Sequence, residues 1–258
     1  MIVAGMATVG LLHPGEMGAA LGQVLRDRGH EVLWASSGRS EATSKRAAAA
    51  GLSDVLSVET LVERSEVIFS VCPPHAALDV ARTTIGSAGL LVDANAIAPA
   101  TARAIAAERD SSGFVDGGII GPPPRTSGTT RLYVSGARAS SVAELFEQTA
   151  VDARVVSATV GDASAVKMTY AAWTKGTAAL LLAIRAVAEA EGVEAALVEE
   201  WRLSLPELPA ALSRAQRSAA AKGWRWIGEM EEIAATFAAA GLPDGFHRAA
   251  AQIFGRSS

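Results

Sequence analysis

Residues Thr8 to Gly22, which read TVGLLHPGEMGAALG, constrain the fold more than any other segment of the chain. A short apolar run leads into a turn containing Gly15 and Gly18, and residues with helical spacing follow. Strand, glycine turn and helix form the context in which a G-x-G-x-x-G fingerprint binds a dinucleotide, because backbone N–H groups and the positive helix N-terminus meet the pyrophosphate. His13 stands at the first glycine position of that fingerprint. The segment predicts a nucleotide-binding turn; the alternative is a glycine-rich turn without a ligand.

The composition is that of an ordinary globular protein. The chain has 258 residues, half of them apolar, and a net charge of −4, which gives no reason to expect nucleic-acid binding. The single cysteine, Cys72, excludes an internal disulfide framework and fits a reducing cytoplasm. The four histidines have no ligand spacing, so no metal site is expected. The start of the chain lacks the features of a signal peptide, and the longest apolar run, Ala178 to Ile184, is too short to cross a bilayer. We therefore expect a cytoplasmic protein without nucleic-acid or membrane partners.

Strand-like and helix-like segments alternate through the first half of the chain. Strands are expected at 31–35, 65–71, 90–93 and 113–116, and helices at 41–50, 75–82 and 99–109. This order predicts an α/β fold of the Rossmann type, a doubly wound, mostly parallel sheet with helices on both faces. Ligands of such sheets bind beyond the carboxyl ends of the strands.

The loop after the second expected strand indicates which nucleotide binds. NAD enzymes usually place an acid there for the ribose 2′-hydroxyl, whereas NADP enzymes use arginine and small hydroxyls for the 2′-phosphate. No acid occurs between Val32 and Ser40; the loop instead offers Ser36, Ser37, Arg39 and Ser40. The guanidinium of an arginine is able to donate two hydrogen bonds to one phosphate, so the loop favours NADP over NAD. The alternative is that Arg39 is a solvated loop residue.

The second half is expected to be mainly helical. Residues 130–135 and 153–156 favour strands, 142–148 a helix, and the domain boundary is expected near 157–162. The predicted domains are thus 1–158, which binds the dinucleotide, and 159–258, which is small and all-α. The latter opens with a proline-free segment, 163–191, long enough for a helix of roughly 45 Å between domains. Further helices are expected at 194–203, 206–221, 224–240 and 244–253. About a hundred residues bury limited surface alone, so we expect docking on the first domain and on a second subunit, as a homodimer.

Lys167 is the main candidate for acid–base chemistry. It has apolar neighbours and lies in the first turns of the long helix. Desolvation and the positive helix end would both lower its pKa toward working pH, which suits a general acid/base. The alternative is a surface lysine whose stem packs along the helix. Lys175, two turns later on the same face, is a second candidate.

Other segments at the expected ligand edge carry polar or flexible residues. Asn95 follows a strand and is expected either to hydrogen-bond a substrate or to cap the next helix. The segment 117–121 reads as a glycine-rich loop whose backbone N–H groups would meet a carboxylate or phosphate. Cys72 is better explained as a small buried hydrophobe than as a catalytic residue. Core packing is likewise favoured over substrate contact for three clustered tryptophans, Trp201, Trp224 and Trp226.

Five motifs occur in a fixed order along the chain. They are Gly15-Glu16-Met17-Gly18, Val71-Cys72-Pro73-Pro74, the segment 93–99, the segment 116–122 followed by Gly128-Thr129-Thr130, and the segment 161–171. They resemble the G-x-G-x-M-G turn, the proline turn, the D-x-S-x-x-x-P segment, the substrate loop and the lysine-bearing helix of the β-hydroxyacid dehydrogenases. That family includes 3-hydroxyisobutyrate and 6-phosphogluconate dehydrogenases. The resemblance is nearest to the 6-phosphogluconate dehydrogenase NAD-binding-like branch, which has a short helical C-terminal domain.

The resemblance implies an NADP-dependent oxidoreductase acting on CH–OH donors. Hydride would pass between the nicotinamide and a carbonyl/alcohol substrate, with Lys167 as acid/base at the reacting oxygen. The residues predicted to be catalytic are Lys167, Asn95 and Tyr170. Those predicted to bind cofactor are His13, Pro14, Gly15, Glu16, Met17, Ser36, Ser37, Arg39, Ser40, Cys72, Pro73 and Asn95. Those predicted to bind substrate are Gly117, Gly118, Ile119, Ile120, Gly121, Trp173, Trp226 and Glu229.

The chain departs from the family at several polar positions. The departures are Tyr170-Ala171 for two asparagines after the lysine, Ile120 for a serine, Pro122 for a glycine, and Glu229-Met230 for a Lys-Asp pair. These changes remove groups that hold a hydroxy-acid carboxylate. We therefore expect a substrate other than 3-hydroxyisobutyrate or 6-phosphogluconate, in a more apolar pocket shaped by Ile120, Tyr170, Trp173 and Trp226.

Two other functions compete with this interpretation. The first is imine reduction on the same scaffold: imine reductases usually replace the lysine with Asp or Tyr, so Lys167 argues against it, whereas the phenol of Tyr170 would be able to deliver a proton. The second is an NADP-binding protein without turnover. Lys167 argues against that function, and Ala171 is compatible with it.

Overall fold

The computed structural model describes residues 5–109 and 113–256. The chain divides into two compact units, Met1–Lys167 and Met168–Ser258. The division falls inside one helix, α7 (Asp162–Ala190), and so lies C-terminal to the boundary expected from the sequence. The predicted long helix is confirmed to within one residue at each end.

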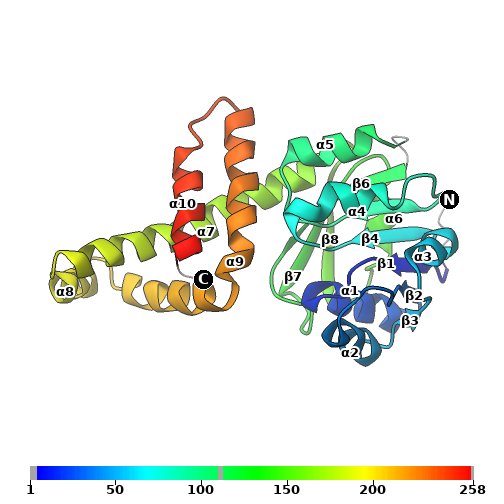
Figure 1. Ribbon diagram of the computed structural model, residues 1–258, viewed down its shortest axis with the longest axis horizontal. Coiled ribbons are helices and arrows are strands. Elements are labelled where there is room, and N and C mark those ends of the chain that lie inside the picture. The colour runs from blue at the N-terminus through cyan, green and yellow to red at the C-terminus, as the bar shows by residue number, and fades with distance from the viewer. Residues whose placement is uncertain (1–4, 110–112, 257–258) are drawn as a thin grey trace. The chain divides into compact units, whose positions relative to one another are not determined.

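One sheet forms the centre of the first unit (Figure 1). Its strands in the described residues are β1 (Thr8–Leu11), β2 (Glu31–Trp34), β3 (Ser53–Asp54), β4 (Val67–Ser70), β5 (Leu90–Asp93), β6 (Phe114–Ile120), β7 (Thr130–Ser135) and β8 (Val151–Ser157). They lie in the order β3-β2-β1-β4-β5-β6-β7-β8, and neighbours are parallel except β6 and β7. The predicted doubly wound, mostly parallel sheet is confirmed. Strand order reverses between β1 and β4, which places the expected ligand crevice beyond their carboxyl ends.

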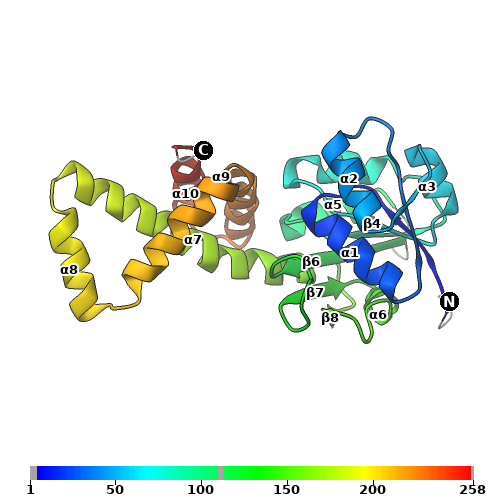
Figure 2. The same cartoon turned by 90° about the horizontal axis from the view of Figure 1, so that it is seen from below.

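Helices cover both faces of this sheet (Figures 1 and 2). One face carries α1 (Glu16–Asp27), α2 (Glu41–Ala49) and α6 (Ala139–Glu144); the other carries α3 (Val58–Arg64), the 3₁₀ turn η1 (Pro74–Ala76), α4 (Ala77–Arg82) and α5 (Pro99–Ala107). The two cores separate because successive strand side chains point to opposite faces. In β4, Phe69 packs into the first core and Ile68 into the second.

Several local expectations for the first unit are wrong. β3 and α3 went unpredicted because two and seven residues are too few to show periodicity. α6 begins at Ala139, earlier than expected. The segment 117–120 is not a loop: β6 continues to Ile120, and every residue of that strand is buried. β7 pairs with these residues. At Gly117 and Gly118 there is no room for a side chain, because a Cβ at either position would lie within 3 Å of neighbouring atoms.

The second unit contains the remainder of α7 with α8 (Glu194–Ser204), α9 (Leu208–Ala239) and α10 (Gly245–Arg256). Two helices expected at 206–221 and 224–240 are one, because the lone Gly223 weakens a helix without ending it. Aromatic contacts join α9 to α10, with the rings of Trp226 and Phe254 5.0 Å apart. Among the clustered tryptophans Trp201 is buried as predicted, but Trp224 is 61% exposed, so core packing was wrong there.

α7 is the described helix that is long and apolar enough to cross a membrane, with a mean hydropathy of 1.2 over its best 18-residue window. The apolar run 178–184, which is too short to cross a bilayer, is only part of this helix. One such helix is weak evidence for a membrane span, since core helices of soluble proteins have the same length and composition.

Candidate functional site

The turn between β1 and α1 is shaped to receive an anion. Gly15 is the N-cap of α1 and supplies no side-chain cap, so the N–H groups of the first turn have no side-chain acceptor. Gly15 N–H donates to the carbonyl of His13 at 2.9 Å, which closes the turn. A Cβ on Gly18 would collide with that same carbonyl oxygen, whereas the space beside Gly15 is open. The predicted order of strand, glycine turn and helix is therefore present, and the N–H groups at the start of α1 face the turn without a side-chain cap.

His13 and Arg39 lie together beside this turn. Each has a buried nitrogen without a hydrogen-bond partner, Nδ1 in His13 and Nε in Arg39. Another Arg39 nitrogen donates to the carbonyl of Leu12 at 3.4 Å. Burial and the charge of Arg39 lower the pKa of His13 to about 4, so the imidazole is neutral at physiological pH.

The loop after β2 holds the predicted serines in different roles. Ser40 caps α2, its Oγ accepting from the N–H of Thr43 at 3.3 Å. Ser36 donates its backbone N–H to Asp54 at 3.2 Å, and Leu56 donates to the same oxygen at 2.8 Å. Burial opposes ionisation of Asp54, but hydrogen bonds from Ser36 and Leu56 outweigh it and lower the pKa of the carboxyl. The carboxylate therefore holds the loop in shape.

Sequence reasoning did not place Asp54 or Arg46 at this edge. Asp54 belongs to β3, whose two residues gave no strand signal. Arg46 lies on α2, and its Nε donates to the carbonyl of Pro14 at 3.4 Å, which brings a second guanidinium to the turn. Arg46 lies in the last turn of α2, and its contact with Pro14, 32 residues earlier in the chain, leaves no local signal in the sequence.

Asn95 joins the ends of β4 and β5. Its Nδ2 donates to Ser70 Oγ at 3.0 Å and to Asp93 Oδ2 at 2.8 Å, and its Oδ1 accepts from the N–H of Cys72 at 2.5 Å. It does not cap α5, whose N-cap is Ala98, so that alternative is wrong. Burial raises the pKa of the Cys72 thiol to about 11, which agrees with an unreactive, small apolar residue.

Asp116 fixes the start of α7. The carboxylate is fully buried and accepts from Ser135 Oγ, from the N–H groups of Gly161 and Ser164, and from Ser164 Oγ, at 2.5–3.0 Å. A carboxylate at a helix N-terminus also interacts favourably with the helix dipole. The sequence placed Asp116 at a strand end without assigning it this role.

Lys167 lies one turn beyond this anchor. Its Nζ donates to the carbonyl of Ile119 at 2.8 Å, and its Cβ is where a Cβ on Gly118 would clash, at 2.8 Å. Ile119 is beyond Asp116, the last residue of β6 that pairs with β5. β1, β4, β5 and β6 are parallel, so the Ile119 carbonyl and the β1–α1 turn lie at the same edge of the sheet.

The remaining predicted residues belong to the second unit. Lys175 on α7 pairs with Glu229 on α9 at 2.7 Å, with both side chains largely buried, and its Nζ lies 5.7 Å from the ring centre of Trp226. Trp173 and Trp226 line a cavity of about 330 Å³ between α7 and α9. Tyr170 and Trp173 are 48% and 74% exposed.

Known proteins match both parts of the chain. Residues 8–96 match the family described as NADP oxidoreductase, coenzyme F420-dependent, and residues 188–257 match a domain of unknown function, DUF1932. An uncharacterized 28.5 kDa protein of Methanothermus fervidus is 34% identical over 193 residues, 74% of each chain. A conserved protein of unknown function, described as structurally similar to 3-hydroxyacid dehydrogenases, is 29% identical with a TM-score of 0.71, over 97% of this chain and 96% of that one.

The chain belongs to the β-hydroxyacid dehydrogenase family. It carries the NAD(P)-binding oxidoreductase domain together with the DUF1932 C-terminal domain. The predicted family is therefore confirmed, and with it a nicotinamide-type cofactor.

More distant members of the β-hydroxyacid dehydrogenase fold have assigned activities. The 3-hydroxyisobutyrate dehydrogenase of Mycobacterium tuberculosis, solved with L-serine, is 20% identical with a TM-score of 0.69, over 98% of this chain and 94% of that one. An imine reductase of Streptomyces aurantiacus is 21% identical with a TM-score of 0.55, over 96% and 93%. At these identities the likeness shows the fold alone, which is that of soluble dehydrogenases.

Proposed function

We propose that this protein is an NADP(H)-dependent oxidoreductase that transfers hydride between the nicotinamide and a carbonyl/alcohol substrate, with Lys167 as general acid/base. The observation that carries the proposal is the 2.8 Å hydrogen bond from Lys167 Nζ to the Ile119 carbonyl, at the ligand edge of the sheet. A lysine anchored there by its own helix N-terminus has the placement that proton transfer requires.

The first unit has groups that fit NADP(H). The uncapped N-terminus of α1 offers N–H groups to a pyrophosphate, and the unpartnered Nε of Arg39 offers a donor to a 2′-phosphate. NAD is the less favoured cofactor, because the acid near the loop, Asp54, is already occupied by backbone N–H groups.

The bound nicotinamide would supply or accept hydride, and the protein would handle the proton. An ammonium has three donors. The Ile119 carbonyl occupies one of them, and another would donate a proton to the substrate oxygen during reduction. During oxidation the neutral amine would take the hydroxyl proton. The hydrogen bond to Ile119 keeps Nζ in one position through both steps.

Two positions near Lys167 support a substrate less polar than a small hydroxy acid. Ala171, at the asparagine position of the family motif that this segment resembles, is fully buried, and Ile120, at the serine position of the resembling substrate loop, is 4% exposed. Neither side chain is able to hydrogen-bond a carboxylate. We infer that 3-hydroxyisobutyrate and 6-phosphogluconate are poor substrates.

Replacement of Lys167 tests this function. NADPH and NADH binding is measured first by titration. NADPH oxidation is then screened over aldehydes, ketones and cyclic imines, and NADP reduction is screened over hydroxy acids. Lys167→Ala should lower turnover about 10²–10⁴-fold, because the proton donor is lost, while NADPH affinity stays near the wild-type value.

Lys175→Ala is the matched variant on the same helix. It should retain far more activity, since Lys175 is engaged by Glu229. The reverse ranking of the two variants would transfer the role to Lys175, and near-normal turnover of Lys167→Ala would remove Lys167 as the acid/base.

Imine reduction is the second candidate, favoured by the half-exposed phenol of Tyr170. Turnover of cyclic imines that is lost in Tyr170→Phe and retained in Lys167→Ala would establish it. NADPH binding without turnover of any of these substrates would favour a non-catalytic binding protein.

A further inference from the structure

We propose that His13 is a second ligand for the 2′-phosphate of NADP(H), acting with Arg39, and that it takes up a proton when that phosphate binds. The inference rests on the proposed cofactor and assigns to His13 the discrimination between NADP(H) and NAD(H). His13 occupies the first glycine position of the fingerprint, so the side chain is an addition to the turn rather than part of its backbone geometry.

Two unsatisfied nitrogens carry the argument. Buried polar atoms without a partner are rare in folded proteins, and here both Nδ1 of His13 and Nε of Arg39 lack one, in two side chains close enough for the charge of Arg39 to act on the imidazole. They come from the β1–α1 turn and the β2–α2 loop. Both are able to donate to a phosphate, which has several acceptor oxygens, and Arg39 fixes the 2′-position as the phosphate concerned.

The charges around His13 make proton uptake depend on the ligand. Burial and the positive charge of Arg39 both disfavour the imidazolium in the free protein. Cys72, on the β4 side, is a neutral thiol, and Asp93 behind it is hydrogen-bonded to Asn95. Arg46 approaches the turn through the carbonyl of Pro14 and adds positive charge, whereas Glu16 at the start of α1 is exposed to solvent.

A phosphate dianion placed between His13 and Arg39 reverses this balance. The free imidazole has a pKa of about 4, and an adjacent dianion raises it, so the complex binds more protons than its separate parts. NADP(H) affinity should therefore fall as pH rises toward the raised pKa, by up to tenfold per pH unit. The phosphate itself loses a charge below about pH 6, so the effect belongs to the range above that value.

Calorimetric titration measures this proton directly. NADPH and NADH are titrated into the wild-type protein at about pH 7.5, above the second pKa of the phosphate, in two buffers of different protonation enthalpy. NADPH binding should take up a measurable fraction of a proton, set by how far the phosphate raises the pKa of His13, and NADH binding should take up none. Any proton released by the 2′-phosphate has the opposite sign, so an uptake belongs to the protein.

Two histidine variants make the measurement specific. His13→Gln should abolish the uptake and weaken NADPH binding about tenfold or more, while NADH affinity is unchanged. His30→Gln is the matched control: His30 also has a pKa lowered by burial, but both its nitrogens have partners, Ala7 N–H and the Leu145 carbonyl. That variant should keep the wild-type uptake.

Three results would overturn the inference. The first is that NADPH binding to the wild-type protein takes up no proton. This result does not depend on whether any variant folds. The second is equal uptake with NADH, which would place His13 on the pyrophosphate. The third is an unchanged uptake in His13→Gln. Absence of binding by both nucleotides would instead overturn the proposed function, and this inference with it.

Discussion

A single carboxylate organises the residues that surround Lys167. Asp116 collects four donors from β7 and from the first turn of α7, and thereby sets the rotation of the helix against β6. Because Lys167 lies one turn further along α7, the contacts of Asp116 also set the position of Lys167. Burying a charge is favourable only when it is fully hydrogen-bonded, as it is here.

Gly118 gives a testable measure of how closely α7 lies against β6. A Cβ there would lie 2.8 Å from Lys167 Cβ and 2.9 Å from the Ala163 carbonyl oxygen. Gly118→Ala should therefore destabilise the protein by about 1–3 kcal/mol and lower turnover by displacing Lys167. Urea denaturation and the rate measure the two effects.

Gly228→Ala is the control for that substitution. Gly228 lies within α9, and a Cβ there would meet no atom within 4 Å. Because alanine favours helix, this variant should gain about 0.5–1 kcal/mol. Equal stability of the two variants would show that α7 does not lie against β6 in this way.

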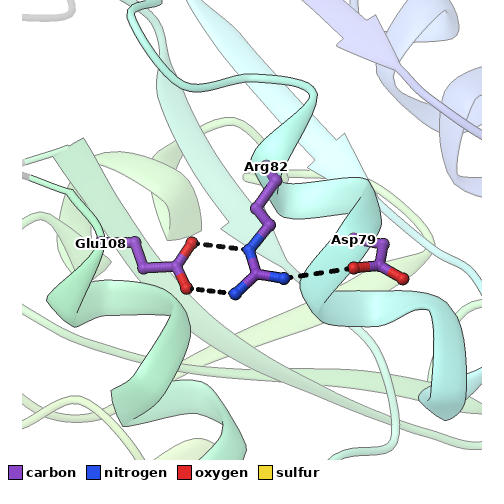
Figure 3. Close-up of polar contacts among 3 residues, drawn as sticks. All are labelled: Asp79, Arg82 and Glu108. Atoms are coloured by element: carbon purple, nitrogen blue, oxygen red, sulfur yellow. Dashed lines mark hydrogen bonds and ion pairs between the residues drawn. The ribbon is translucent and has the colours of Figure 1, made fainter.

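At the scale of elements, side-chain caps and surface ion pairs hold the short helices in place. Ser40 caps α2 and Ser57 caps α3 by the same geometry, each Oγ accepting from the N–H three residues later. Arg82 links α4 to the end of α5: it contacts both oxygens of Glu108, at 3.0 and 2.7 Å, and Asp79 at 3.3 Å (Figure 3). This ion cluster is exposed, so salt weakens it.

The two serine caps separate a structural role from a cofactor role. Ser40→Ala and Ser57→Ala should each lose about 1 kcal/mol of stability, because each leaves a helix N–H without its acceptor. Since Ser40 is also a predicted NADP ligand, only Ser40→Ala should weaken NADPH binding, measured by titration beside urea denaturation. Equal NADPH affinity of both variants would leave Ser40 as a cap alone.

The sequence predicted best the elements that have a regular hydrophobic pattern or that are bounded by glycine or proline. The predicted bounds of β1, β4, β5 and the proline-free α7 are close to the observed ones. Buried strands and long helices have regular patterns of apolar residues, which the sequence shows directly. β3, α3 and the continuation of β6 through its glycines depend on pairing with neighbouring strands. The contacts of Asp116 with Ser164, of Asn95 with Cys72 and of Arg46 with Pro14 join residues 48, 23 and 32 positions apart, so no local pattern encodes them.

At the scale of the whole molecule, the second unit exposes a regular apolar stripe. Trp173, Leu180 and Val187 recur every seven residues on α7 and are 74%, 45% and 63% exposed. A seven-residue apolar repeat is the period with which helices pack side by side. We propose that a second copy of the chain covers this stripe in a homodimer.

Light scattering after size-exclusion chromatography tests that dimer. The wild-type protein should have twice the chain mass, and Val187→Lys should shift it toward the monomer, because a charge would be desolvated in the interface. Leu242→Lys, at a similarly exposed leucine outside α7, is the control and should leave the mass unchanged. A monomeric wild-type protein at micromolar concentration would contradict the proposal.

The bonds made by Asn95 have a consequence for recognition at the sheet edge. One carboxamide ties Ser70, Cys72 and Asp93 together, so the ends of β4 and β5 cannot move independently. The rim of the crevice is thus preorganised when the chain folds. A ligand that binds there does not have to order the protein backbone at the rim. Less of the free energy of its contacts is therefore offset by lost entropy, and its affinity is higher.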